Sequence, residues 1–128
     1  MKAQYGVDIR FVPPKTDFAV NIDEQMFMQV IINLVKNASE ALANSQTKNP
    51  FVEVSALRLS SGETEITVKD NGPGIPENIK NEIFVPFFTT KETGSGIGLS
   101  YSQQVLRAHG GSISCQSGSN GTAMRLVF

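Results

Sequence analysis

Polar and apolar residues alternate most regularly between Glu63 and Asp70, which is the pattern of a half-buried strand. Ile66 and Val68 point to one face of that strand, and Thr67 and Lys69 point to the other. If the alternation continues for one more residue, Asp70 points inward with the two apolar side chains. A carboxylate in that position is costly unless hydrogen-bond donors reach it. The pattern therefore predicts a strand that ends in an inward-facing acid.

Five other short stretches show apolar or alternating patterns bounded by turn-forming residues. They are predicted as strands at Val7–Val12, Phe18–Ile22, Val52–Ser60, Ser112–Ser117 and Thr122–Phe128. Ser61-Gly62 joins the third of these to the Glu63–Asp70 strand, and Gly118-Ser119-Asn120-Gly121 joins the last two. Both pairs are therefore expected to form antiparallel hairpins.

Two longer stretches show helical spacing instead. A helix is predicted to begin after an N-cap at Asp23 and to end near Asn44. The face of this helix that is expected to enter the core carries Phe27, Val30, Ile31, Leu34, Ala38, Ala41 and Leu42. A second helix is predicted from Leu99 to Ala108, because His109-Gly110-Gly111 supplies glycines at its C-terminal end. A short additional helix is predicted from Glu77 to Phe84, directly after Pro76.

The order of these elements is typical of a mixed α/β fold. No repeat, low-complexity tract or linker divides the 128 residues, which suffice for one domain with a core but not for two. We therefore expect residues 1–128 to form one domain, a two-layer α/β sandwich with helices on one face of a mixed, mostly antiparallel sheet. The chain begins almost directly on a strand, which suits either a small protein or a domain cut from a larger one.

Composition excludes several classes of protein. With 40% hydrophobic residues and a formal net charge of −1, the chain lacks the basic excess of a nucleic-acid-binding domain. No apolar run approaches the roughly 20 residues that cross a bilayer, so no membrane contact is expected. One cysteine and one histidine exclude an internal disulfide and a Cys/His metal cluster, which favours a reducing, cytoplasmic location. Cys115 and His109 are both expected to serve packing rather than chemistry.

The polar face of the first helix is unusual in composition. Within an arc of about 100° it carries Gln29, Asn33, Lys36, Asn37 and Glu40. Exposed helix faces are usually rich in lysine and glutamate, because asparagine is a mediocre helix former. Two asparagines one turn apart, with a lysine between them, present amide oxygens and an ammonium group to one spot. The face is therefore a candidate binding surface, and an ordinary solvated face is the alternative.

Two glycine-containing stretches complete the candidate site. Asp70-Asn71-Gly72-Pro73-Gly74-Ile75-Pro76 ends its strand and lets the backbone approach a ligand closely, although it also fits an ordinary strand-ending turn. Gly94, Gly96 and Gly98 alternate before the second helix, where converging N–H groups and the helix N-terminus suit a phosphate. A flexible loop without a ligand is the alternative there. The segment from Phe87 to Ile97 lacks apolar periodicity and is a candidate mobile lid.

Together these stretches supply what a magnesium nucleotide needs. Asn37 offers a neutral oxygen to Mg²⁺, which keeps water and phosphate oxygens as its other ligands. Lys36 and Lys91 can neutralise phosphate charge, as can the N–H groups from Gly94 to Gly98. Asp70 can accept a hydrogen bond from the exocyclic amine of adenine. Guanine places a carbonyl oxygen at that position, so the residues predict a preference for ATP over GTP.

Five stretches of the sequence resemble, in order, the characteristic boxes of two-component sensor histidine kinases. Gln29–Ala38 resembles the N box, Asp70–Gly74 the G1 box and Phe84–Lys91 the F box. Gly94–Leu99 is similar to the G2 box, and Gly121-Thr122 to the small final box. The resemblance covers nearly the whole chain. It implies the catalytic ATP-binding domain of such a kinase, with the Bergerat fold that gyrase-type and Hsp90-type ATPases share.

The resemblance also implies a role for each matching residue. Asn37 would bind Mg²⁺ and Asp70 would read adenine, with Gly72, Gly74, Ile75 and Thr122 around the base. Asn33, Lys36 and Lys91 would face the phosphates and are the predicted catalytic residues. The triphosphate would lie along Gly94, Gly96, Ile97, Gly98 and Leu99. Phe84, Phe87 and Phe88 would anchor the lid.

The chain shows two departures, one from the related ATPases and one from the complete kinases. Those ATPases carry a glutamate base one turn before the Mg²⁺-binding asparagine, where this chain has Asn33, so efficient ATP hydrolysis is not expected. Glu40 lies about two turns further along and is a poor substitute. The phosphoacceptor histidine is also missing.

The expected function is therefore transfer of the γ-phosphoryl group to a histidine on a separate dimerisation domain, with a response regulator as an indirect partner. An anti-sigma-factor-type serine kinase and a nucleotide-responsive module without turnover are the alternatives.

Overall fold

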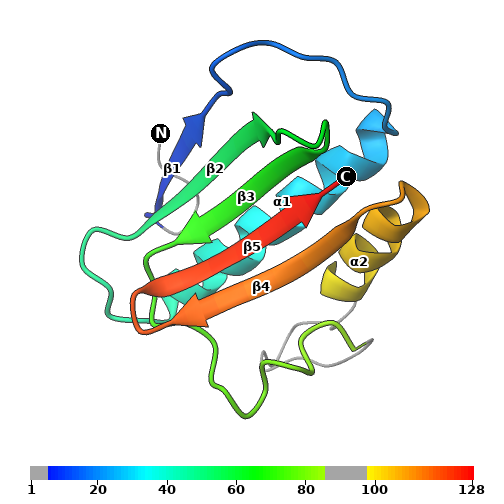
Figure 1. Ribbon diagram of the computed structural model, residues 1–128. Coiled ribbons are helices and arrows are strands. Elements are labelled where there is room, and N and C mark those ends of the chain that lie inside the picture. Colours follow the sequence, from blue (N-terminus) through cyan, green and yellow to red (C-terminus); the bar gives the residue numbers. More distant parts are fainter. Residues whose placement is uncertain (1–5, 86–97) are drawn as a thin grey trace.

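The computed structural model describes residues 6–85 and 98–128, and within them it shows one mixed sheet covered by two helices on the same face (Figure 1). In chain order the elements are β1 (Asp8–Val12), α1 (Glu24–Ala43), β2 (Phe51–Arg58), β3 (Thr64–Asp70), α2 (Gly98–Ala108), β4 (Ser112–Gly118) and β5 (Gly121–Val127). The strand order is β1-β2-β3-β5-β4. Only β1 and β2 run parallel in this sheet, and α1 connects them. The predicted two-layer architecture is confirmed.

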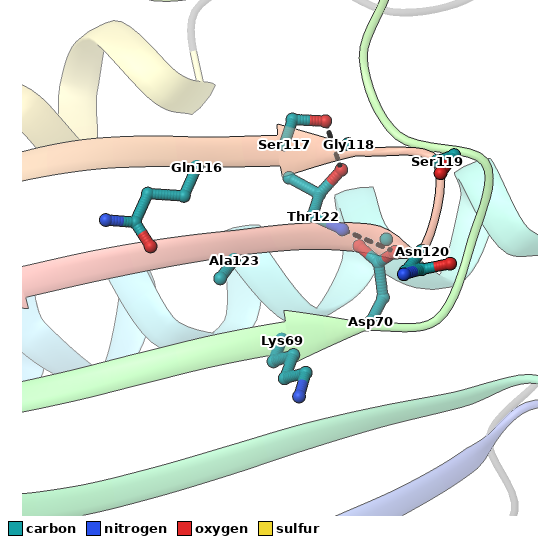
Figure 2. Close-up of a pocket in the computed structure, with 10 residues that line it drawn as sticks. Lys69, Asp70, Gln116, Ser117, Gly118, Ser119, Asn120, Thr122 and Ala123 are labelled. Atoms are coloured by element: carbon teal, nitrogen blue, oxygen red, sulfur yellow. Dashed lines mark hydrogen bonds between the residues drawn. The ribbon is translucent and has the colours of Figure 1, made fainter.

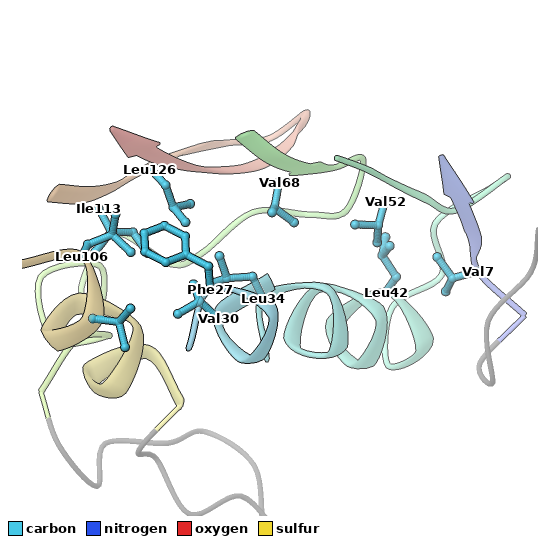
Figure 3. Packing of buried hydrophobic residues seen from close by; sticks show 11 residues of the cluster. Val7, Phe27, Val30, Leu34, Leu42, Val52, Val68, Leu106, Ile113 and Leu126 are labelled. Carbon is cyan, nitrogen blue, oxygen red and sulfur yellow. The ribbon is translucent and has the colours of Figure 1, made fainter. Parts of the chain in front are cut away.

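The hydrophobic core lies between the sheet and the two helices (Figure 3). Its buried members from α1 are Phe27, Val30, Leu34 and Leu42, and they face Val52, Val68, Ile113 and Leu126 of the sheet. Leu106 of α2 is fully buried in the same cluster. The core therefore holds α1 beneath the centre of the sheet and α2 beneath its β4 edge.

Helix α1 begins where its N-cap was predicted, because the Asp23 side chain accepts a hydrogen bond from the Met26 N–H at 3.0 Å. The predicted core face is correct except at one position. Ala41 is exposed, whereas Ser39 is buried. Asn33, Asn37 and Ala41 follow one another at four-residue intervals, so they form one strip along the helix. Ala41 belongs to that polar strip instead of to the core.

The inward orientation predicted for Asp70 is confirmed. Val68 and Asp70 are both buried, while Lys69 between them is exposed. Backbone pairing places Thr122 of β5 beside Asp70, and Ser117 of β4 beside Thr122. Asp70, Thr122 and Ser117 therefore lie in one row across β3, β5 and β4, on the side of the sheet that faces the helices.

Two predicted elements are absent from the described chain. The stretch from Phe18 to Ile22 is not a strand, because residues 13–23 form the connection from β1 to α1 and have no strand to pair with. Ile22 nevertheless packs against the core, and the Arg58 guanidinium lies 5.1 Å from the centre of the Phe18 ring. Phe18 and Ile22 are thus partly buried, whereas the three residues between them are exposed, and the apolar run did not indicate a paired strand.

The segment from Glu77 to Phe84 is a series of turns instead of the predicted helix. Its backbone bonds span three residues, as from the Ile79 N–H to the Pro76 oxygen at 3.1 Å and from the Glu82 N–H to the Ile79 oxygen at 2.9 Å. Ile83 is its buried hydrophobic residue. One such anchor does not provide the apolar face that stabilises a short α-helix.

His109 has the structural contacts expected of it. Its Nδ1 lies 2.8 Å from the Val105 oxygen, and its Nε2 accepts a hydrogen bond from the Asp23 N–H at 3.1 Å. The ring also meets Phe27 edge-on, with centroids 4.8 Å apart. His109 thus joins the end of α2 to the start of α1.

Cys115 is half-buried on the helix-facing side of β4, and burial raises the pKa of its thiol.

Candidate nucleotide-binding site

The Asp70 carboxylate, at the end of β3, is held by the backbone around it. Its Oδ1 accepts hydrogen bonds from the Gly72 N–H at 2.9 Å and from the Thr122 N–H at 3.3 Å. The residue is 8% exposed, and burial raises the pKa of its carboxyl, although the two hydrogen bonds act in the opposite direction. Both of these bonds use Oδ1. The second oxygen therefore keeps its capacity to accept a donor from a ligand.

Two glycines bring the chain after β3 close to this carboxylate. A Cβ at Gly72 would lie 3.1 Å from Asp70 Oδ1 and 3.2 Å from a methyl carbon of Leu42. Gly74 has a φ of +86°, and a Cβ there would overlap the Gly118 carbonyl oxygen of β4. Gly74 therefore needs glycine for both conformation and space, whereas a Cβ at Gly72 would require the Asp70 or Leu42 side chain to shift by a few tenths of an ångström. The backbone of this segment therefore lies close to the Asp70 carboxylate and to β4.

Ser117 is a residue of this region that the sequence did not single out. Its Oγ accepts a hydrogen bond from the Ile75 N–H at 2.6 Å and lies 3.1 Å from Thr122 Oγ1 (Figure 2). The alternation of β4 could have indicated it, because Ile113 and Cys115 precede it on the same face at two-residue spacing.

The start of α2 lies against the polar strip of α1. A Cβ at Gly98 would be 3.8 Å from Asn37 Nδ2 and 4.0 Å from Asn33 Cβ. Ser102, which is fully buried, bonds the Gly98 oxygen at 2.9 Å and fixes the first turn of α2. Leu99 is partly buried and packs on the core. The fold therefore brings two segments, more than sixty residues apart in the sequence, to one place.

The amide of Asn33 has a defined orientation in this strip. Gln29 Nε2 donates to Asn33 Oδ1 at 2.9 Å, one turn away on α1. The Asn33 side chain thereby keeps both of its N–H donors and one lone pair of its oxygen for further bonds. Lys36 is exposed on the same helix.

Four predicted site residues, Lys91, Gly94, Gly96 and Ile97, lie outside the described residues. The predicted lid from Phe87 to Ile97, with Phe87 and Phe88, does so too. Phe84 is described and packs against the core. The described part of the candidate site thus consists of the end of β3, the strip on α1 and the N-terminus of α2.

A hollow of about 410 Å³ opens at the β4–β5 hairpin (Figure 2). Its lining includes Asp70 and Thr122 on the helix-facing side and Lys69, Gln116 and Ala123 on the other. No residue of α1 lines it. The hollow therefore overlaps the candidate site only at Asp70 and Thr122.

Comparison with protein families identifies the class of this fold. A family model described as histidine kinase-, DNA gyrase B- and HSP90-like ATPase matches residues 22–128. The chain belongs to this family. The match spans the candidate site from α1 to the end of β5, including every predicted site residue.

Similar proteins of known kind are sensor kinases. The chain is 42% identical over 94 residues to the C4-dicarboxylate transport sensor protein DctB of Rhizobium meliloti, covering 73% of this chain and 15% of DctB. It is 36% identical over 121 residues to the sensor protein FixL of Bradyrhizobium diazoefficiens, covering 94% of this chain and 23% of FixL. The chain thus spans less than a quarter of the length of either relative.

Solved structures place the chain more narrowly within the family. The nucleotide-free catalytic domain of the histidine kinase ThkA superposes with a TM-score of 0.82 at 32% identity, over 98% of this chain and 80% of that one. ThkA in complex with the response regulator TrrA matches with a TM-score of 0.78 at 31% identity, over 98% of this chain and 34% of that one. The chain is a catalytic domain of the histidine kinase type.

Proposed function

We propose that this domain binds Mg-ATP and, in a longer sensor kinase, delivers the γ-phosphoryl group to a histidine on a separate dimerisation domain. The observation that carries the proposal is the buried Asp70 carboxylate, bonded through one oxygen to the Gly72 and Thr122 N–H groups. A buried acid with one oxygen left to accept is suited to a ligand donor, and the adenine amine is such a donor.

The base would lie against the end of the sheet. Asp70 would accept from the exocyclic amine of adenine, while Gly72, Gly74 and Ile75 would form the wall beside it and Thr122 the floor. Guanine would place its carbonyl oxygen against the same carboxylate, and the two acceptors would repel each other. The domain should therefore select ATP over GTP.

The phosphates would lie between α1 and the start of α2. Gly98 is at the N-terminus of α2, whose N–H groups favour an anion, and it adjoins Asn33 and Asn37 of α1. Asn33 and Lys36 would donate to the phosphate oxygens. Lys91, Gly94, Gly96 and Ile97, which lie outside the described residues, are proposed for the same role, with Leu99 following them on α2.

Magnesium fits the donors present at this end. The described residues hold no group of three His, Cys, Asp or Glu that could bind a metal by themselves. An ion bound with ATP needs few protein ligands, because phosphate and water supply the rest, and the Asn37 amide oxygen would provide one. When bound, the ion would neutralise charge on the phosphates.

This domain's residues would position the nucleotide, and its partner would supply the nucleophile. Asn33 stands where an ATPase base is expected, and an amide does not accept a proton from water. The ATP would therefore be held for transfer instead of being rapidly hydrolysed. A response regulator would take the phosphoryl group later, and ThkA was crystallised with such a regulator.

Nucleotide titration of the chain tests the first half of the proposal. We expect ATP and ADP to bind in the presence of Mg²⁺ and GTP to bind much more weakly, as measured by isothermal titration calorimetry. Equal affinity for ATP and GTP would contradict the assignment of Asp70.

Phosphotransfer tests the second half. Joining the chain in cis or in trans to the dimerisation domain of its parent kinase should yield a phosphoprotein that is labile in acid and stable in base, as phosphohistidine is. An acid-stable product would support the serine kinase alternative instead. No product under either arrangement would leave only nucleotide binding, without transfer. The matching proteins are histidine kinases, which favours the first outcome.

A further inference from the structure

The chain after β3 is tied to the end of the sheet through one hydroxyl group. Ser117 Oγ accepts a hydrogen bond from the Ile75 N–H at 2.6 Å, a short bond that holds the segment from Asn71 to Pro76 near its end. The Ser117 carbonyl oxygen also accepts a hydrogen bond from Lys80 Nζ at 3.4 Å. Gly74, directly before Ile75, packs on the Gly118 carbonyl. Ser117 is therefore the point of β4 to which this segment is attached.

The Ser117 hydroxyl is also linked to Asp70 by hydrogen bonds through Thr122. Ser117 Oγ lies 3.1 Å from Thr122 Oγ1, and the Thr122 N–H donates to Asp70 Oδ1 (Figure 2). Ile75, Ser117, Thr122 and Asp70 thus form a continuous chain of hydrogen bonds. The link to Ser117 uses the Thr122 hydroxyl, and the link to Asp70 uses the Thr122 N–H.

The backbone of Ser117 does not depend on its hydroxyl. β4 and β5 remain paired from Ser112 to Gly118, and Ser117 lies opposite Thr122 within that ladder. Removal of the hydroxyl leaves this pairing intact, but it leaves the Ile75 N–H without an acceptor. The hydroxyl therefore stabilises the segment from Asn71 to Pro76 more than it stabilises the sheet.

We propose that Ser117 is a positioning residue for adenine recognition, which rests on the proposed binding of ATP. Its hydroxyl fixes the segment from Asn71 to Pro76 against β4. The Gly72 and Thr122 N–H groups then both hold Asp70 Oδ1, and the other carboxylate oxygen stays directed at the base. Without the hydroxyl, the wall loosens and selection between bases weakens.

The test compares Ser117→Ala with two matched variants. Ser117→Thr keeps the hydroxyl on a residue that strands favour. Ser114→Ala makes the same chemical change on the same strand at an exposed position of the opposite face. ATP and GTP affinities are measured with Mg²⁺ for each variant, and amide hydrogen exchange of Ile75 is measured without nucleotide.

We expect Ser117→Ala to weaken ATP binding about tenfold and GTP binding less than about twofold, so that selectivity between the bases falls. Exchange at Ile75 should accelerate in the same variant. Ser117→Thr should restore ATP affinity to within about threefold of the wild type, and Ser114→Ala should match the wild type.

Equal losses for ATP and GTP would overturn the inference, because they would indicate general loosening of the domain. An unchanged ATP affinity in Ser117→Ala would also overturn it while leaving the proposed function standing. Failure of the wild-type chain to bind ATP would instead overturn the proposed function, and the role in base selection with it.

Discussion

The two ends of the candidate site are built in different ways. At the end of β3, Asp70 is buried and its carboxylate is bonded to backbone N–H groups of two separate segments. On α1, Lys36 is exposed, and Asn33 is bonded to Gln29 of its own helix. The proposed base-reading end is thus held by backbone hydrogen bonds from two segments. The described part of the proposed phosphate end presents side chains of α1, of which Lys36 is exposed.

Gly74→Ala is the substitution expected to destabilise the region around Asp70 most. The substitution combines a φ of +86° with overlap on the Gly118 carbonyl oxygen, so we expect it to lower the free energy of unfolding by about 3 kcal/mol. Gly110→Ala is the control, because Gly110 has a φ of +74° but open space around its Cβ position, and it should cost about 1 kcal/mol. Urea denaturation measures both. Equal costs would show that the close packing contributes nothing.

Asp70→Asn should separate binding from stability. The oxygen of the substituted amide can still accept from the Gly72 and Thr122 N–H groups, which turns the amide nitrogen toward the adenine amine, donor against donor. We expect ATP affinity to fall by about 100-fold by calorimetry. The free energy of unfolding should not decrease, because a buried charge is removed. Asp17→Asn, at an exposed loop position, should change neither quantity.

Asn37→Ala tests the proposed metal ligand at the other end of the site. We expect the gain in ATP affinity that Mg²⁺ provides to fall by about tenfold, while affinity measured in the presence of a chelator changes little. Gln25→Ala, at an exposed position near the start of α1, is the control. Loss of affinity with and without Mg²⁺ alike would contradict the assignment of Asn37 to the metal.

At the candidate site, a pH dependence is expected from Asp70. Burial raises the pKa of Asp70 from its ordinary value of 3.8, so the folded protein keeps a proton that the unfolded chain has already released. The contribution of this group to stability is therefore fully present below pH 3.8 and is lost as pH rises through the folded pKa. Urea denaturation across this range should show Asp70→Asn gaining on the wild type as pH rises. ATP affinity should change oppositely, falling as acid protonates Asp70.

Sequence patterns predicted the position of Asp70 better than the residues that contact its surroundings. Alternation alone placed Asp70 inward, because a period of two leaves one choice of face. Ser117 was missed, although the alternation of β4 places it on the helix-facing side, because its role depends on a contact with Ile75, 42 residues earlier. Ala41 was assigned to the core for its apolarity, although its place on α1 puts it in line with Asn37. Contacts between distant segments decide such positions, and one-dimensional periodicity does not record them.

The single parallel pairing in the described sheet has a consequence for how the chain assembles. β2–β3 and β4–β5 join through short connections, whereas β1 reaches β2 only after the whole of α1 has been traversed. Closing that longer loop costs more chain entropy before any pairing is gained. β1 is therefore expected to dock after the two hairpins have formed. Its amides, with β2 on one side and no described strand on the other, are expected to open before those of the central strands β2 and β3.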